Sequence, residues 1–176
     1  MTSKLNTACF VIHTIQAIMF LETLRMVYFA YIHSIIRYGI IFWGNLRFLK
    51  YKKKVIRIIT SSRPRDSCTE LFKNLEILPL YSQYIYSISI YVVKNKHLFY
   101  TNNQIHSIHT KFKTNLYPPT ANLTKNQKGV YYSAIKIFNN LLHEIKDLAN
   151  DILPFWNALQ RFLLTNSFYN SKEYFN

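Results

Sequence analysis

Glycine is scarce in this sequence, with three glycines among 176 residues. Tight hairpin turns and the loops that cradle phosphate groups both depend on glycine, because it adopts positive φ angles at no steric cost. Hydrophobic residues make up 49% of the chain and aromatic residues 16%, which is enough apolar material for a packed core. The sequence therefore predicts a mainly α protein, a small helical bundle, and it carries neither a P-loop nor a dinucleotide-binding glycine motif.

Apolar residues recur at helical spacing along most of the chain. The pattern predicts a short helix through Leu71, which Asp66 or Ser67 would cap, and longer helices over residues 5–20, 21–37, 46–60, 79–98, 129–148 and 151–165. Gly39 and Gly44 are expected to break the pattern between the second and third long helices, and the C-terminal tail is expected to fray.

Residues 99–128 differ in composition from the rest of the chain, since they are rich in Asn, Thr and Lys and contain Pro118-Pro119. They predict a long basic loop, in which the alternation over residues 110–114 also fits a short strand. We therefore expect three segments along the chain: a helical segment over residues 1–98, the loop over 99–128, and a C-terminal helical segment over 129–176.

The chain is strongly basic, with a formal net charge of +14. This imbalance implies an anionic partner, either nucleic acid or an anionic membrane surface, although a basic protein without such a partner would have the same charge. Two charge-free stretches, residues 5–21 and 77–93, are short for a membrane span and amphipathic, so we interpret them as core helices. Cys9 and Cys68 are isolated, so we expect reduced thiols in an intracellular protein, nuclear or cytoplasmic.

The most basic stretch is NLRFLKYKKKVIRIITSSRPR, residues 45–65, which contains eight Lys or Arg residues and no acid. On a helical projection its apolar side chains gather on one face, and only Lys52 intrudes there, from where its stem is expected to reach outward. A solvated helix face usually mixes charges of both signs, so the one-signed face favours nucleic-acid binding. The candidate phosphate-binding residues are Arg47, Lys50, Lys53, Lys54 and Arg57, with Arg63 and Arg65 at the rim.

The acidic residues offer little for catalysis, because no two of the eight Asp and Glu residues are adjacent. Two-metal nucleotidyl transfer needs carboxylates that converge on ions about 4 Å apart. His106 and His109 have no third zinc ligand nearby, and no serine lies in a GxSxG elbow. We therefore expect no enzymatic active site, no metal or other cofactor, and no small-molecule substrate.

Five stretches carry a resemblance to a known family. They are KLNTACFVIHTIQ, LETLRMVYFAYIHSIIRYGIIFWGN, KKKVIRIITSSRPRDSC, LEILPLYSQYIY and YYSAIKIFNNL, in this order over residues 4 to about 165. The ordered set resembles the region that follows the palm domain in reverse transcriptases of non-LTR retrotransposons, most closely the jockey-like elements. In that family the region forms the helical thumb, which holds the primer–template duplex, and a C-terminal extension.

The resemblance implies a fragment of an RNA-directed DNA polymerase. The family's catalytic signature ends in Asp-Asp, and no Asp-Asp occurs in this sequence. The expected activity is therefore sequence-independent binding of an RNA–DNA hybrid or duplex backbone, with the palm and fingers of the parent polymerase as possible protein partners. Two alternatives stay open: an inert retrotransposon remnant without a function, and a basic protein that associates with membranes.

Overall fold

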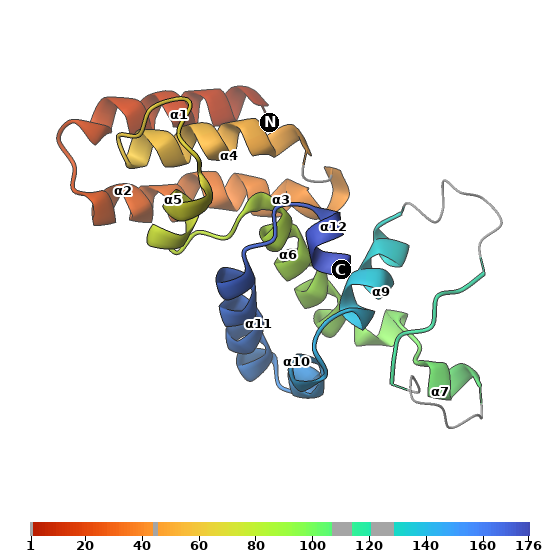
Figure 1. Cartoon of the computed structure of the whole chain (residues 1–176). Coiled ribbons are helices and arrows are strands. Elements are labelled where there is room, and N and C mark those ends of the chain that lie inside the picture. The colour runs from red at the N-terminus through yellow and green to blue at the C-terminus, as the bar shows by residue number, and fades with distance from the viewer. Residues whose placement is uncertain (1, 44–45, 107–113, 121–128) are drawn as a thin grey trace. The chain divides into compact units, whose positions relative to one another are not determined.

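The computed structural model describes residues 2–43, 46–106, 114–120 and 129–176 (Figure 1). The regular structure in these ranges is helical, apart from one isolated antiparallel bridge between Thr101 and Leu116. The predicted mainly α class is confirmed. The chain divides into two compact units, and the boundaries between them fall inside α6, Leu80–Lys94, and α11, Ile152–Asn166.

Unit 1 consists of the residues up to Tyr84 together with Leu163–Tyr174 and Asn176, and unit 2 consists of Ile85–Phe162 and Phe175. The contacts therefore group the chain differently from the three segments predicted along the sequence, and that segmentation stays a prediction. The helices of the N-terminal part are α1 Thr2–Gln16, α2 Leu21–Val27, the π-helical η1 Tyr28–His33, α3 Ser34–Trp43, α4 Leu46–Ile59 and α5 Thr69–Asn74.

In unit 1, α1 and α4 lie side by side and run in the same direction, while α2, η1 and α3 run the opposite way (Figure 1). A bond of 2.6 Å from Gln16 Nε2 to Ser61 Oγ joins the C-terminal ends of α1 and α4. The core between the helices follows the predicted apolar faces only in part, because Val11, Ile18, Met19 and Tyr31, which the helical spacing places on those faces, are exposed. Its fully buried side chains include Leu5, Ala8 and Ile12 of α1, Ile36 and Ile40 of α3, and Val55 and Ile56 of α4.

The predicted break at Gly39 is wrong, because the helix that contains Gly39 continues to Trp43. A glycine inside a helix costs about 1 kcal/mol relative to alanine. Burial of the neighbouring Ile36 and Ile40, both fully inaccessible to solvent, outweighs that cost. Gly44 lies outside the described residues.

The predicted N-cap of the short helix is also wrong. Cys68 occupies the N-cap of α5 and makes no side-chain capping bond. The Asp66 carboxylate instead accepts the N–H of Arg63 at 2.8 Å, which closes a turn around Pro64, and Ser67 Oγ accepts the N–H of Thr69 at 3.4 Å. Asp66 therefore shapes the loop that precedes the helix.

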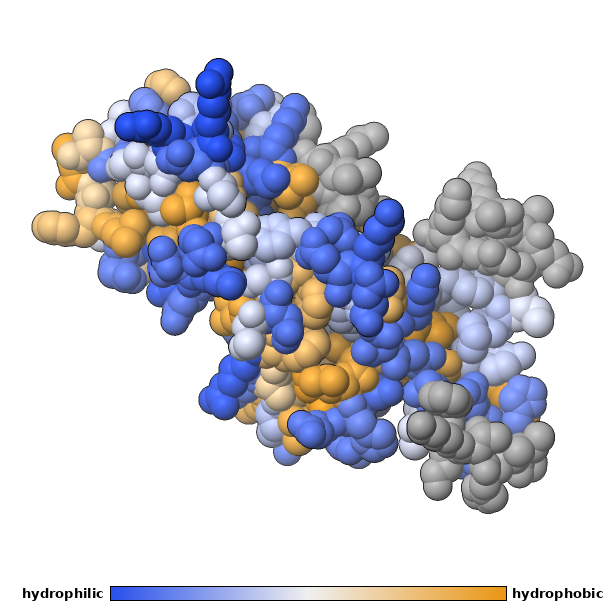
Figure 2. Space-filling view, in the orientation of Figure 1, coloured by the Kyte–Doolittle hydropathy of each residue, from blue (hydrophilic) through white to orange (hydrophobic). Residues whose placement is uncertain are grey.

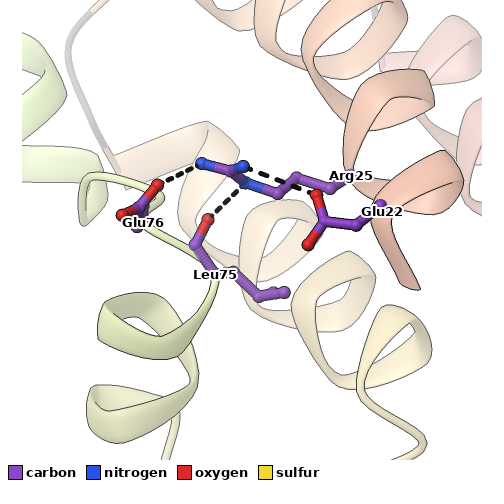
Figure 3. Close-up of polar contacts among 4 residues, drawn as sticks. All are labelled: Glu22, Arg25, Leu75 and Glu76. Carbon is purple, nitrogen blue, oxygen red and sulfur yellow. Dashed lines mark hydrogen bonds and ion pairs between the residues drawn. The ribbon is translucent and has the colours of Figure 1, made fainter.

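Arg25 ties α2 to the end of α5 (Figure 3). Its Nη2 donates to Glu76 Oε2 at 2.6 Å, its Nε donates to the carbonyl of Leu75 at 2.7 Å, and Nη1 lies 3.7 Å from Glu22 Oε2. The guanidinium carbon also lies 5.6 Å from the centroid of the Phe29 ring. One side chain thus joins two elements that are about 50 residues apart in the sequence.

Helices α4, α5 and α11 end without glycine. Ser61, Glu76 and Ser167 have φ angles of 53°, 51° and 50°, in the left-handed region that glycine usually occupies after a helix. Helix α4 ends in a Schellman motif at Ser61. The N–H of Ser61 donates to the carbonyl of Ile58 at 3.1 Å, and the N–H of Ser62 donates to the carbonyl of Arg57 at 2.9 Å. The scarcity of glycine therefore leaves some backbone strain at these helix ends.

The remaining elements are η2 Lys96–Leu98, α7 Asn102–Ile105, α9 Val130–Asn139, α10 His143–Asp147, η3 Leu148–Asn150, α11 and α12 Ser171–Phe175. The helix predicted over residues 129–148 is thus divided between α9, α10 and the start of η3. Of the predicted basic loop, residues 99–106 and 114–120 are described. The first range connects η2 to α7 and includes α7, and the second range is an extended stretch. The proposed strand at residues 110–114 lies almost entirely outside the described residues.

The C-terminal tail does not fray as predicted. Asn170 caps α12, because its Oδ1 accepts the N–H of Glu173 at 3.0 Å. Tyr174 is 5% exposed, and its ring meets Phe168 edge-on at 5.2 Å. Tyr169 donates its hydroxyl to the carbonyl of Thr69 at 3.4 Å. Burial of these aromatic rings holds the tail on unit 1.

Candidate nucleic-acid interface

The predicted basic face is present on α4 and on the loop that follows it. Lys50 and Lys54 are exposed, and Lys53 and Arg57 are half-buried. Arg63 and Arg65 are exposed on the loop. Arg47 belongs to α4, and its side chain lies outside what the structure describes. The opposite face of α4 packs into the core as predicted, with Phe48, Tyr51, Val55, Ile56 and Ile59 buried.

A groove of about 570 Å³ opens between the C-terminal parts of α1 and α4. Three of the seven predicted cations meet there, namely Lys50, Lys54 and Arg57. Lys53, Arg63 and Arg65 do not line it. None of its described lining residues is acidic; beside the three cations they are His13, Gln16, Ile58, Ser61, Ser62 and Pro64. The groove therefore combines positive charge with hydrogen-bonding side chains.

Arg57 has a structural bond as well as a charge. Its Nε and Nη2 both donate to the carbonyl of Asp66, at 3.2 and 2.8 Å, so the guanidinium anchors the loop after α4. Lys50 lies with its Nζ 5.0 Å from the centroid of the Tyr51 ring. The salt bridges in the described part of the chain engage neither these two residues nor Lys54. Their charges are therefore available to an external anion.

The charge of Lys54 also acts on a neighbouring core residue of α1. Burial raises the pKa of the Cys9 thiol, and the positive charge of Lys54 opposes this rise. Both Cys9 and Cys68 are buried free cysteines in the structure. Lys54 also lines the groove together with His13 and Gln16 of α1, so its charge lies on the side of α4 that faces α1.

Lys52 does not reach outward as predicted. Its side chain is fully buried, and its Nζ donates to Gln83 Oε1 of α6. Burial lowers the pKa of Lys52 to about 7, since an ammonium loses its hydration in the core. The hydrogen bond to a buried amide explains how the core accommodates this side chain where outward extension was expected. Lys52 therefore does not belong to the exposed basic face of α4.

Two residues of η1 add further polar groups to the core of unit 1. Tyr28 and His33 come from η1, and their rings lie 6.2 Å apart. Burial, followed by the charges of Lys52 and Arg37, lowers the pKa of His33 to about 4. Within the described ranges, Tyr28 Oη, His33 Nδ1 and Gln83 Nε2 are buried without a hydrogen-bond partner. The core of unit 1 thus contains several buried polar groups in addition to Lys52.

An apolar tip lies next to the groove, in the connection from α1 to α2. We define it as Ile18, Met19, Phe20 and Leu21. Ile18 is 77% exposed and Phe20 is 85% exposed. Figure 2 shows hydrophobic surface at this end of unit 1, where α1 turns into α2. Large apolar side chains that gather on a surface usually mark an interaction or an aggregation site.

Sequence reasoning missed four polar residues of the groove, His13, Gln16, Ser61 and Ser62. A signal for the first two was present, because His13 and Gln16 are three residues apart and so lie on the same side of a helix. Ser61 and Ser62 carried no comparable signal. They reach the groove because the chain reverses after α4 in the Schellman motif.

Among the residues that the structure describes, no group of three or more His, Cys, Asp or Glu side chains is arranged to hold a metal ion. Within the same ranges, each helix is too short or too polar to pass through a bilayer.

No family model matches the chain, and neither a curated protein nor a solved structure matches it.

Proposed function

We propose that this chain binds the sugar–phosphate backbone of double-helical nucleic acid, an RNA–DNA hybrid or a duplex, without reading its sequence. The observation that carries the proposal is the groove between α1 and α4. There Lys50, Lys54 and Arg57 converge without an acidic neighbour among the lining residues. Backbone phosphates are recognised mainly by such cations, and sequence-independent affinity comes from the counterions that they displace.

The groove's other side chains suit the same ligand. Gln16, Ser61 and Ser62 offer amide and hydroxyl groups that can donate to phosphate or sugar oxygens. His13 adds a further positive charge when it is protonated. Lys53, Arg63 and Arg65 stand outside the groove and would add longer-range attraction, which screening weakens at high salt.

The proposal extends to the chain's origin through its sequence resemblance. A helical unit with a basic groove suits the thumb of a jockey-like reverse transcriptase, which grips the primer–template while the palm performs the chemistry. We assign this chain no catalytic residue, cofactor or small-molecule substrate, and the palm and fingers of the parent polymerase are its proposed protein partners. Such a fragment would act in the nucleus or the cytoplasm.

The test compares two charge-matched double variants. K50Q/K54Q removes two exposed cations of the groove, and K4Q/K73Q removes two exposed cations of unit 1 that do not line it. Affinity for an RNA–DNA hybrid and for a DNA duplex is measured by fluorescence anisotropy across a salt series. We expect the log–log salt slope of K50Q/K54Q to fall by roughly two, because each phosphate contact contributes about 0.9.

The control distinguishes binding in the groove from attraction by the total charge of the protein. K4Q/K73Q should keep the wild-type slope to within a few tenths, because long-range charges are screened. Equal losses in the two variants would show a diffuse electrostatic effect and refute the groove. Unchanged binding by K50Q/K54Q, with an unchanged circular dichroism spectrum, would refute it as well.

A second candidate function is attachment to an anionic membrane surface, which the apolar tip favours. Ile18 and Phe20 would enter the interface while the neighbouring cations meet lipid phosphates. Flotation with vesicles of phosphatidylserine and phosphatidylcholine tests it against vesicles of phosphatidylcholine alone. Binding that requires phosphatidylserine and is lost in I18S/F20S would support this candidate, whereas protein that stays at the bottom of the gradient would exclude it.

A further inference from the structure

Unit 2 contains a separate pocket of about 400 Å³. Its volume lies in the lower part of the range typical of small-molecule sites. Six of its lining residues are buried and apolar. They come from five parts of the unit: Val92 and Val93 of α6, Phe99 after η2, Leu116, Phe138 of α9 and Ala149 of η3. These six side chains give the pocket an apolar inner wall.

Directional hydrogen bonds hold one wall of this pocket in place. Asn139 binds the backbone of Leu116 twice, because its Oδ1 accepts the N–H at 2.8 Å and its Nδ2 donates to the carbonyl at 2.9 Å. The two residues that flank Leu116 also form backbone hydrogen bonds. The N–H of Asn102 donates to the carbonyl of Asn115 at 2.9 Å, and the N–H of Tyr117 donates to the carbonyl of Tyr100 at 2.8 Å. These bonds fix the extended stretch around Leu116 against both α9 and the start of α7.

Aromatic rings pack against Phe99, which also lines the pocket. Phe99 and Tyr131 are parallel, with centroids 4.9 Å apart, and Tyr91 meets Phe99 edge-on at 6.1 Å. The Tyr131 hydroxyl donates to the carbonyl of Leu98 at 3.1 Å. The pocket is therefore built on packed aromatic side chains and paired backbone, which keeps its shape before any ligand arrives.

Two ammonium groups are positioned at the polar side of the pocket. Lys96 Nζ donates to Asn150 Oδ1 at 3.0 Å. Lys146 Nζ donates to Asn115 Oδ1 at 3.3 Å and to the carbonyl of Asn139, at the C-terminus of α9, at 3.1 Å. An ammonium has three N–H donors, so these bonds orient both groups and leave donors for a further acceptor. Burial lowers the pKa of Lys146, and the charge of Asp147 opposes this shift.

The acidic residue of the lining is already engaged. Asp147 Oδ2 lies 2.7 Å from His143 Nδ1, one helical turn earlier on α10. When His143 is protonated this pair is neutral overall, and the two lysines then dominate the local charge. The lining thus offers an apolar floor, two fixed cations and a paired carboxylate.

We propose that this pocket binds a small organic anion with a flat apolar body, an aromatic or alicyclic carboxylate or sulfonate. The apolar body would cover Val92, Phe99 and Phe138, and the anionic group would accept from Lys96 and Lys146. This site is separate from the proposed nucleic-acid groove, since every residue that lines it belongs to unit 2. A charge-assisted contact is about twice as strong as a neutral one, so the carboxylate should dominate selectivity.

The probe is 2-naphthoate, and its neutral analogue 2-naphthamide is the matched ligand control. Saturation-transfer NMR on the full chain should show saturable binding of 2-naphthoate with a dissociation constant of about a millimolar or below, from the affinity usual per ligand atom. Binding of 2-naphthamide should be about tenfold weaker, because it cannot form the charge-assisted contacts.

Three variants locate the site. K96Q should weaken 2-naphthoate binding about tenfold. A149L should weaken it at least as much by filling the cavity. K94Q is the control, since Lys94 lies over the Trp156 ring at 5.2 Å and does not line the pocket, so its affinity should be unchanged. If A149L fails to fold, the exposed K96Q still tests the proposal alone.

Three results would overturn the proposal. They are equal binding of 2-naphthoate and 2-naphthamide, equal binding by K96Q and wild type, and no saturable binding at millimolar concentrations. A parallel titration of I18S/F20S excludes the apolar tip as the binding surface. Its affinity for 2-naphthoate should equal that of wild type, and a loss of binding in this variant would place the ligand at the tip and refute the pocket.

Discussion

Arg25 Nη2 donates to Glu76 Oε2 over 2.6 Å, and this bond joins α2 to the left-handed residue that ends α5. The Arg25 side chain is 28% exposed and that of Glu76 is 70% exposed, so solvent screens the ion pair. The Nε bond to the carbonyl of Leu75 and the contact with Phe29 add to it. Arg25 should therefore matter more through its combined contacts than through the ion pair alone.

The first prediction concerns these contacts. R25A should lower the free energy of unfolding by about 1–2 kcal/mol, because it loses two hydrogen bonds and the packing on Phe29. E22A should cost only a few tenths of a kcal/mol, since that pair is 3.7 Å long and Glu22 is 77% exposed. Urea denaturation of both variants checks this order, and an equal loss in the two would contradict it.

The second prediction concerns the pH dependence of stability that Lys52 creates. Its pKa is about 7 in the folded state and near the ordinary 10.5 in the unfolded chain. Between these values the unfolded state binds more protons, so stability should rise with pH, from about pH 7 until tyrosines ionise near pH 10. Below pH 7 both states hold the proton, and the cost of the buried charge, on the order of a few kcal/mol, is constant.

The matched variant removes both partners. K52M/Q83L should flatten the rise above pH 7 and stabilise the protein at pH 6, because the variant removes both the buried ammonium and the amide that pairs with it. K52M alone should stabilise less, since the Gln83 oxygen then loses its donor. Thermal melts over this pH range measure both effects. A wild-type stability that stays flat or falls between pH 7 and 9 would contradict the burial of Lys52.

The third prediction tests the left-handed residue at the end of α4. S61V should destabilise the protein by about 1–2 kcal/mol, because a β-branched side chain is poorly tolerated at positive φ. S61G should be neutral or stabilising by up to about 1 kcal/mol, although it loses the bond from Gln16. Chemical denaturation distinguishes the two, and the reverse order would show that the Schellman end is absent.

The fourth prediction concerns self-association through the apolar tip. Exposed apolar patches drive association, so I18S/F20S should be more monomeric than wild type at the same concentration. Y38S is the control, because Tyr38 is 82% exposed on α3, away from the tip. Sedimentation velocity at several concentrations provides the measurement. A shift toward monomer in Y38S as large as that in I18S/F20S would argue against a special role of the tip.

The sequence allowed prediction of most of the helices because burial follows a simple period. The helical projection put the apolar side chains of α4 on one face, and Phe48, Val55 and Ile56 are buried there. The break at Gly39 was predicted wrongly, because local propensity weighs less than the burial of Ile36 and Ile40. The ordered tail was also missed, since its stability comes from contacts with residues far away in the sequence, such as Thr69.

The candidate groove was only partly predictable. The helical projection placed Lys50, Lys54 and Arg57 on one face, and the structure brings these three together. The projection gave no information on the side of the groove that α1 forms, because the periodicity of one helix does not predict which distant helix packs against it. Lys52 shows the same limit, since only the position of Gln83 on α6 explains how a lysine is accommodated in the core.

The membership of Leu163–Tyr174 in unit 1 has a consequence for synthesis on the ribosome. Ser82 Oγ donates to the carbonyl of Phe168 at 3.1 Å, so the two parts of the unit bond directly. About 80 residues separate them, and at common translation rates these take about 4–16 s to make. During that interval the surface around Ser82 is not yet covered by the segment that contains Phe168. A chaperone that shields this surface co-translationally would therefore raise the yield of folded protein.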